Sequence, residues 1–339
     1  MTGTSLGTPL RHTHHASPVH EPPAAIRATG IVVVLTVALA VLAIAFALPA
    51  ARSKPQGIPI GAAGPMAASG QIADVLEQHA PGAFAITYYP GEAALRDAIR
   101  NRDVYGGISF GQDGRSLLIA TGGSPMVAQM LTQIGNGIAQ QAGVPLHTED
   151  LAPPTANDPR GAGLAASALP ITLAGLLPAV ALVLLLKREV WTRFVAAVVF
   201  ATGAGITIAA LLRYVFGSID HNVWGVAAGL TLGLLAAGLS MLGLGSLFGR
   251  GGLAIGALLA LLLGNPLSGL SSAPEMLPSG WGTLGQWLPQ GASATLLRST
   301  AYFDGAGATT AIAVLACWVV AGTALVVIAA VRQGKSGPA

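Results

Sequence analysis

The sequence predicts a polytopic α-helical membrane protein with six transmembrane helices and a small α/β extracytoplasmic domain between the first and second spans. Charged residues make up only 9% of the chain, whereas soluble globular domains carry about 25%. Six apolar runs reach the roughly 20 residues that a spanning helix requires. The long segment between the first two runs alternates strand and helix patterns, which is typical of a small α/β fold.

The apolar runs have no Asp, Glu, Lys or Arg in their interiors. They cover residues 28–50, 165–186, 194–213, 223–248, 252–273 and 307–331. The first run could be a cleaved signal peptide, because Ala45-Phe46-Ala47 has the small-x-small form of a cleavage site. Its length and the following Pro49 favour an uncleaved signal anchor.

Lys and Arg predict the orientation, because cytoplasmic loops are enriched in them. An N-terminus inside the cell places eight basic residues in inside segments: Arg11, Arg27, Lys187, Arg188, Arg193, Arg250, Arg332 and Lys335. The short outside loops then hold only Arg213 and Arg298. We therefore expect a multi-pass protein of the cell membrane with both termini in the cytoplasm.

The segment 51–164 is predicted to form the α/β domain and a linker. Strands are expected at 57–64 and 83–89, helices at 69–80, 92–103 and 124–143, and a hairpin within 105–121 that turns at Gln112-Asp113-Gly114. Residues 148–163 are expected to link the domain to the second span. No catalytic or metal-binding constellation stands out in this domain.

Domain boundaries follow from these patterns. The predicted parts are a disordered cytoplasmic tail at 1–26, a first transmembrane helix at 27–50, the domain at 51–164, a five-helix transmembrane domain at 165–331 and a cytoplasmic tail at 332–339. The first tail contains His12, His14, His15 and His20. These histidines lack a scaffold that would fix ligand geometry, so metal binding by the tail stays an open alternative.

The sequence contains only incomplete forms of enzymatic motifs. Gly334-Lys335-Ser336 ends like a phosphate-binding loop, but Ala329 stands where the motif needs its first glycine. Ser240 lies among glycines without matching the nucleophile elbow. The net charge of +3 lies mostly at span ends, which argues against nucleic-acid binding. We expect no enzyme activity, cofactor or metal site in this chain. Because the span centres carry no ionisable group, we expect energy for uphill transport to come from outside this chain, with uniport and sodium coupling through backbone groups as open alternatives.

Two spans carry ridges of small residues that allow helix backbones to approach closely. The predicted packing residues are Gly225, Gly229, Gly233, Gly252, Gly256 and Gly264. The segment 265–305 is too broken by proline and glycine to span a membrane, yet it is rich in Leu and Trp. It is expected to form either a pair of re-entrant helices or an amphipathic lid, and the first is favoured because irregular backbone at membrane depth must be buried in protein.

The stretches NPLSGLSSAPEMLP, GWGTLGQWLP and LLRSTAYFDG, together with the order of the spans, resemble the permease subunits of the type-two ABC exporter family. The similarity is greatest to the branch with a large extracytoplasmic domain, which includes phage-infection-protein-like membrane proteins. It implies an outer gate formed by Pro266, Glu275, Pro278, Trp281, Trp287, Pro289, Arg298 and Asp304. It also implies an ATPase-coupling loop that contains Lys187, Arg188, Glu189, Trp191 and Arg193.

The resemblance further implies that a separate ATPase subunit binds ATP and magnesium. The chain would form a homodimer, or a heterodimer with a related permease, surrounded by membrane lipids. Its substrate would be an amphiphile or a cell-envelope precursor that moves outward. The alternative interpretation is a non-transporting receptor or scaffold that displays residues 51–164 to an extracellular partner.

Overall fold

A computed structural model describes residues 23–111, 114–143, 145–187, 189–270 and 272–335. The histidines of the N-terminal tail and the turn residues Gln112 and Asp113 lie outside this described part. The chain divides into two units, Met1–Ile44 and Ala45–Ala339. In the first unit all described residues after Pro23 belong to α1 (Ala24–Ala51), which begins three residues before the predicted first span at 27.

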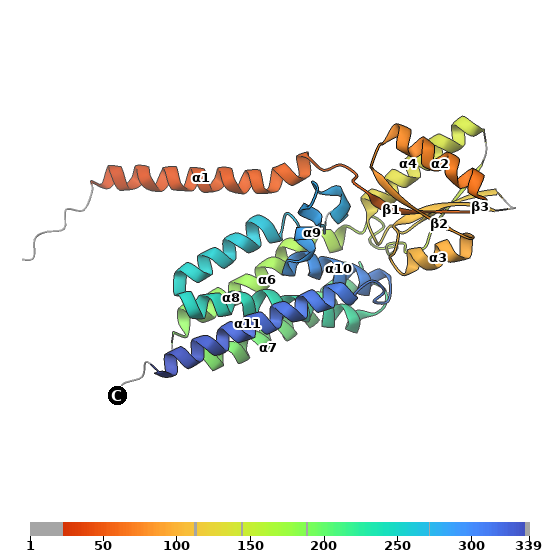
Figure 1. Cartoon of the computed structure of the whole chain (residues 1–339). Coiled ribbons are helices and arrows are strands. Elements are labelled where there is room, and N and C mark those ends of the chain that lie inside the picture. Colours follow the sequence, from red (N-terminus) through yellow and green to blue (C-terminus); the bar gives the residue numbers. More distant parts are fainter. Residues whose placement is uncertain (1–22, 112–113, 144, 188, 271, 336–339) are drawn as a thin grey trace, which may run out of the picture. The chain divides into compact units, whose positions relative to one another are not determined.

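Five helical segments of the described chain are long and apolar enough to cross a membrane, which supports a multi-pass membrane protein. They are Ala24–Pro49, Ala162–Leu185, Val190–Val215, Val223–Gly264 and Thr309–Gly334. The corresponding main helices are α1, α6 (Ala168–Leu185), α7 (Val190–Ala210), α8 (Val223–Leu259) and α11 (Thr309–Lys335) (Figure 1). Two π-helical turns, Leu211–Val215 and Ala260–Gly264, extend α7 and α8.

The fourth and fifth predicted spans are joined in one helical segment, and the fifth is shorter than predicted. The predicted spans 223–248 and 252–273 belong to one helical segment that reverses at Gly249, whose φ of 62° and ψ of −138° are not helical. Gly252 lies against the carbonyl of Leu244, and Gly256 lies against Met241, so the second arm returns along the first. The second arm ends at Gly264 after about 15 residues, or roughly 22 Å of helix.

The helical bundle is built around α8, which packs against α6, α7, α11 and α10 (Pro289–Tyr302). Leu239 and Leu242 are fully buried on α8 and belong to one apolar cluster with Leu176 of α6 and Val326 of α11. Small residues permit the tight packing. A side chain at Gly243 would collide with Leu325 and with the carbonyl of Gly322 on α11.

The domain between the first two spans is a mixed five-stranded sheet of order β2-β1-β3-β4-β5. Its strands are β1 (Ile58–Ala63), β2 (Phe84–Tyr89), β3 (Gly106–Gly111), β4 (Gly114–Ile119) and β5 (Leu146–Asp150). Its helices are α2 (Met66–His79), α3 (Glu92–Arg100) and α4 (Pro125–Ala142). β3 and β4 pair antiparallel and the other neighbours pair parallel, with Ile60 opposite Ile86 and Ile108 opposite Leu117.

Helices cover both faces of this sheet, with α2 and α4 on one side and α3 on the other (Figure 1). Ile58, Leu117 and Val127 belong to the core beneath α2 and α4, whereas Leu95 and Leu118 belong to the core beneath α3. Arg96 of α3 bonds Glu149 of β5 at 2.6 Å, so β5 belongs to the domain. The predicted linker at 148–163 therefore begins inside a strand.

Candidate functional site

The segment 265–305, which we call the outer segment, folds into three short helical pieces before the last span. They are the 3₁₀ turn Pro274–Met276, α9 (Trp281–Gln286) and α10. Pro289 stands at the first position of α10, where its missing N–H removes no helical hydrogen bond. Gly282 and Gly285 lie against the carbonyls of Pro274 and Leu267, so only glycine fits these two positions of α9.

The outer segment also packs into both cores of the α/β domain. Ala273 and Met276 join the core that contains Ile58, while Phe303 joins the core that contains Leu95. Backbone hydrogen bonds add to this contact. The N–H of Lys54 donates to Met276 at 3.0 Å, and the N–H of Gln56 donates to Glu275 at 3.0 Å. The domain and the outer segment are therefore one packed structure.

Four polar side chains meet where these two parts join. The hydroxyl of Tyr105 donates to Oε2 of Glu275 at 2.9 Å. Nη1 of Arg102 donates to the carbonyl of Thr295 at 3.1 Å and to the hydroxyl of Ser299. Arg298 donates to the carbonyl of Gly269 at 2.8 Å and to that of Leu270. Two guanidinium groups thus bridge separate elements through backbone oxygens.

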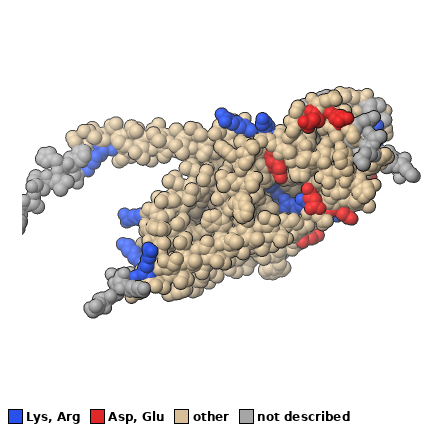
Figure 2. Space-filling view, in the orientation of Figure 1, with Lys and Arg blue, Asp and Glu red and all other residues tan. Residues whose placement is uncertain are grey.

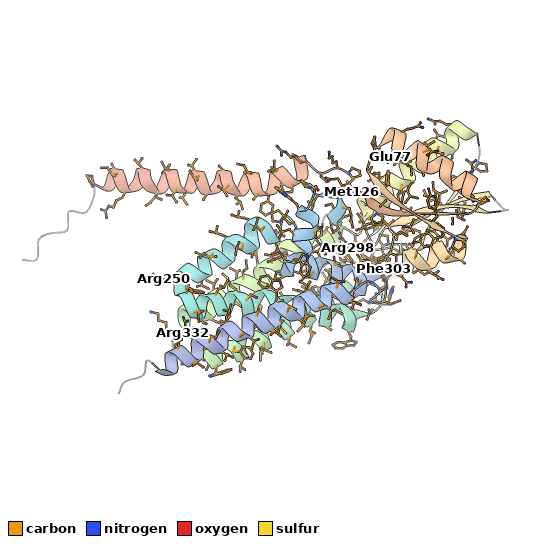
Figure 3. All side chains as sticks on the ribbon, in the orientation of Figure 1. Glu77, Met126, Arg250, Arg298, Phe303 and Arg332 are labelled. Carbon is orange, nitrogen blue, oxygen red and sulfur yellow. The ribbon has the colours of Figure 1, made fainter. Side chains whose placement is uncertain are left out.

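These four side chains line a cavity of about 570 Å³, which we call the junction cavity. Figure 2 shows Lys or Arg atoms close to Asp or Glu atoms at a hollow on this face, and Figure 3 places Arg298 and Phe303 there. The remaining lining combines polar and apolar groups, including Gln56, Asp103, Gln286, Leu277, Trp287 and Val314. A cavity of this size and composition suits a small amphiphilic ligand.

The electrostatics of the cavity are unusual because its two arginines have no carboxylate within salt-bridge distance among the described residues. Arg298 is only 6% exposed. Burial lowers the pKa of Arg102 from its usual range, while Tyr105 and Glu275 act in the opposite direction. Burial also raises the pKa of Tyr105 above its usual range, and the charge of Glu275 raises it further. The phenol is therefore protonated and can donate to Glu275.

Only some of the predicted outer-gate residues belong to this cavity. Those that line it are Glu275, Pro278, Trp287 and Arg298. Trp281 begins α9 and is 37% exposed, Pro266 lies in the turn after the second arm of α8, and Pro289 begins α10. Asp304 lies at the exposed end of α10, with one carboxylate oxygen 4.0 Å from His221.

Arg102 and Tyr105 are site residues that the sequence did not single out. Both lie in the connection between α3 and β3, within a charged stretch that resembles an ordinary solvated helix face. Arg102 has a positive φ of 65°, and its guanidinium lies 5.2 Å from the centre of the Phe303 ring. No local sequence pattern predicts the contacts of Arg102 and Tyr105 with residues so distant in the sequence.

The predicted coupling loop divides into exposed and buried residues. Lys187 and Glu189 are exposed and Trp191 is 57% exposed, whereas Arg188 lies outside the described residues. Arg193 is only 2% exposed. Its guanidinium donates to the carbonyl of Leu186 and, at 3.2 Å, to the hydroxyl of Ser246. Arg193 therefore joins α6, α7 and α8 and is not available to a docking partner.

The small-residue ridges lie against particular neighbours. Gly229 faces Leu296 and Gly233 faces Ser293, so this ridge receives α10. Gly264 lies against the side chain of Gln290, also on α10. Gly252 and Gly256 face the first arm of α8. Gly225 meets only the side chain of Asn222, which precedes α8.

The described residues contain no candidate metal-binding site, because no group of three or more His, Cys, Asp or Glu side chains among them could hold an ion. Comparison of the chain with protein-family models, with curated proteins and with solved structures found no match.

Proposed function

We propose that this chain is the transmembrane permease subunit of an ATP-driven exporter, which moves an amphiphilic substrate outward together with a separate ATPase subunit. The observation that supports this proposal is the junction cavity at the outer segment, directly before the last span. A transporter needs such a site at one end of its pathway, where substrate can leave the membrane part of the protein.

In this proposal α9 and α10 are re-entrant helices that close the outer end of the pathway. Irregular backbone is tolerated at membrane depth only when protein covers it. α10 meets this condition, because Leu296 and Leu297 are buried and the helix lies on the ridge formed by Gly229 and Gly233. Trp281 and Trp287 are 37% and 63% exposed, and tryptophan is enriched at membrane–water interfaces.

The energy source is proposed to be a partner ATPase, because the charged residues of the spans lie near their ends or at the turn of α8. They are Arg27, Arg193, Arg213, Arg250 and Arg332. Proton-coupled transport usually uses ionisable groups deep in the membrane. ATP and magnesium would bind to the partner, and two permease chains would enclose the pathway. Both termini would lie in the cytoplasm of a cell-membrane protein.

We assign the surface that contacts the ATPase to the exposed residues of the loop between α6 and α7. Lys187, Glu189 and Trp191 can reach a cytoplasmic partner, whereas Arg193 cannot without leaving its buried contacts. The aromatic ring of Trp191 also contacts Phe194 edge-on at 6.2 Å, so its position is supported from within the bundle. A rigid exposed aromatic group is a suitable anchor for a protein interface.

Co-purification tests the proposal. The tagged full-length chain is extracted in mild detergent, and the proteins that accompany it are identified. We expect an ATPase subunit that is lost from the double variant Lys187→Glu, Trp191→Ala. Trp224→Ala is the matched control, because this tryptophan is 76% exposed at the opposite end of the bundle. Clean preparations that bring no ATPase would contradict the proposal.

A further inference from the structure

The junction cavity contains more buried positive charge than the surrounding carboxylates neutralise at short range. Arg298 and Arg102 bond only to neutral oxygens among the described residues, and Glu275 already accepts from Tyr105. Asp103 also lines the cavity, but it is exposed to solvent, which screens its charge. Burying a guanidinium without a counter-charge is costly. A bound anion would relieve this imbalance.

We infer that the junction cavity binds the phosphate head group of an anionic amphiphile, with Arg102 and Arg298 as the residues that recognise it. Guanidinium groups present several N–H donors in a plane that matches phosphate oxygens. Arg102 uses only Nη1 for its hydrogen bonds among the described residues, so its Nε and Nη2 stay available for a ligand. The inference rests on the proposed function for its identification of this amphiphile as the exported substrate.

The apolar part of the lining indicates where the tail of the ligand lies. Leu277 and Trp287 of the outer segment and Val314 of α11 border the same cavity. Its volume of about 570 Å³ holds a head group and the first carbons of a chain, but not a whole lipid. The remainder of the tail therefore extends along α11 beside Trp287, whose side chain is 63% exposed.

Glu275 gives the site a means of limiting its affinity. Its carboxylate lies at the same cavity as the two arginines and repels an incoming phosphate. The hydrogen bond from Tyr105 holds this carboxylate in place. An export site must release its ligand, so a repelling group at the exit is functionally reasonable. Neutralising Glu275 should therefore strengthen phosphate binding, which a purely structural role of these residues does not predict.

Binding to the purified full-length chain, without any ATPase, tests the inference. The protein is placed in nanodiscs of phosphatidylcholine and titrated with fluorescent phosphatidic acid, fluorescent diacylglycerol or inorganic phosphate. We expect saturable binding of phosphatidic acid only, weakened about tenfold in Arg102→Gln, because a charge-assisted contact is lost. Glu275→Gln should bind phosphatidic acid more tightly, because the repelling charge is removed. Tyr105 can still donate to the amide oxygen, so the side chain keeps its position.

Arg115→Gln is the matched control, because Arg115 lies 5.6 Å from the Phe110 ring in the same domain but outside the cavity. Equal binding of phosphatidic acid and diacylglycerol would overturn the inference, as would unchanged affinity in a folded Arg102→Gln protein. Inorganic phosphate that binds as tightly as the lipid would overturn the amphiphile part. Because no ATPase is present, these results are independent of the co-purification experiment.

Discussion

The hydroxyl of Tyr105 donates a hydrogen bond of 2.9 Å to the carboxylate of Glu275, and this bond joins the α/β domain to the outer segment across 170 residues of sequence. It is accompanied by apolar contacts of Met276 and Phe303 with the two cores of the domain. A movement of the domain would therefore be transmitted directly to the segment that precedes the last span.

Removing the Tyr105 hydroxyl tests how strongly this bond couples the two parts. Tyr105→Phe leaves the Glu275 carboxylate half-buried without its donor, which should lower the free energy of unfolding by about 1–3 kcal/mol. Thermal unfolding in detergent measures the effect, and Tyr88→Phe, at a tyrosine that is 48% exposed, is the control. Equal stability of the two variants would show that the bond does not join the parts energetically.

Alkaline pH should lower the stability that the buried Tyr105 hydroxyl gives to the folded protein. Burial and, next, the charge of Glu275 raise the pKa of Tyr105, so the folded protein holds this proton more tightly than the unfolded chain. The resulting stability is fully present below the ordinary tyrosine pKa of about 10 and is lost as the pH rises above it. Unfolding curves between pH 8 and 11 should therefore fall less steeply for Tyr105→Phe than for the natural chain. Parallel curves would contradict this assignment.

The reversal at Gly249 should depend on glycine. Its φ of 62° with ψ of −138° is strained for any residue with a side chain, so Gly249→Ala should destabilise the bundle by about 1–3 kcal/mol. Gly251→Ala is the matched control, since a side chain there meets nothing within 4 Å. Similar melting temperatures for the two variants would contradict the hairpin geometry of α8.

Arg193 should be required for stability rather than for docking. Arg193→Gln loses the charge-assisted bonds to Leu186 and Ser246 inside the bundle, at a cost of about 2 kcal/mol or more. Lys187→Gln, at an exposed position six residues earlier in the chain, should leave the melting temperature unchanged. A stable Arg193→Gln protein that fails only in ATPase binding would restore the coupling role that the sequence predicted for this residue.

Local patterns predicted most secondary-structure elements because each has its own signal. Strands β1 and β2 are apolar and rich in β-branched or aromatic residues, and Ser124 with Pro125 marks the start of α4. Strand β5 was missed because its sequence, Leu-His-Thr-Glu-Asp, is mostly polar and pairs at the edge of the sheet. Here pairing with β4 decides the conformation.

The fifth predicted span was too long for a different physical reason. Leu267, Leu270 and Ala273 are apolar, and hydropathy therefore extends the span through them. In the structure these residues are buried by protein in turns of the outer segment. Hydropathy cannot distinguish an apolar residue that contacts lipid from one that contacts protein.

The junction cavity could be predicted only in part. The family resemblance of the outer segment singles out Glu275 and Arg298 as gate residues, and both line the cavity. Arg102 and Tyr105 approach them only after the domain folds back onto that segment, and no periodicity in the sequence encodes this contact. The charge balance of the cavity therefore becomes visible only in three dimensions.

The most direct test of the export proposal is a lipid-movement assay in proteoliposomes that contain the chain and its co-purified ATPase. Fluorescent phosphatidic acid is supplied in the membrane, and dithionite quenching measures how much of it lies in each leaflet. We predict that ATP shifts the labelled lipid away from the ATPase side, and that the Lys187→Glu, Trp191→Ala chain abolishes this shift. An intact complex that hydrolyses ATP without moving fluorescent phosphatidic acid or phosphatidylcholine would contradict the account.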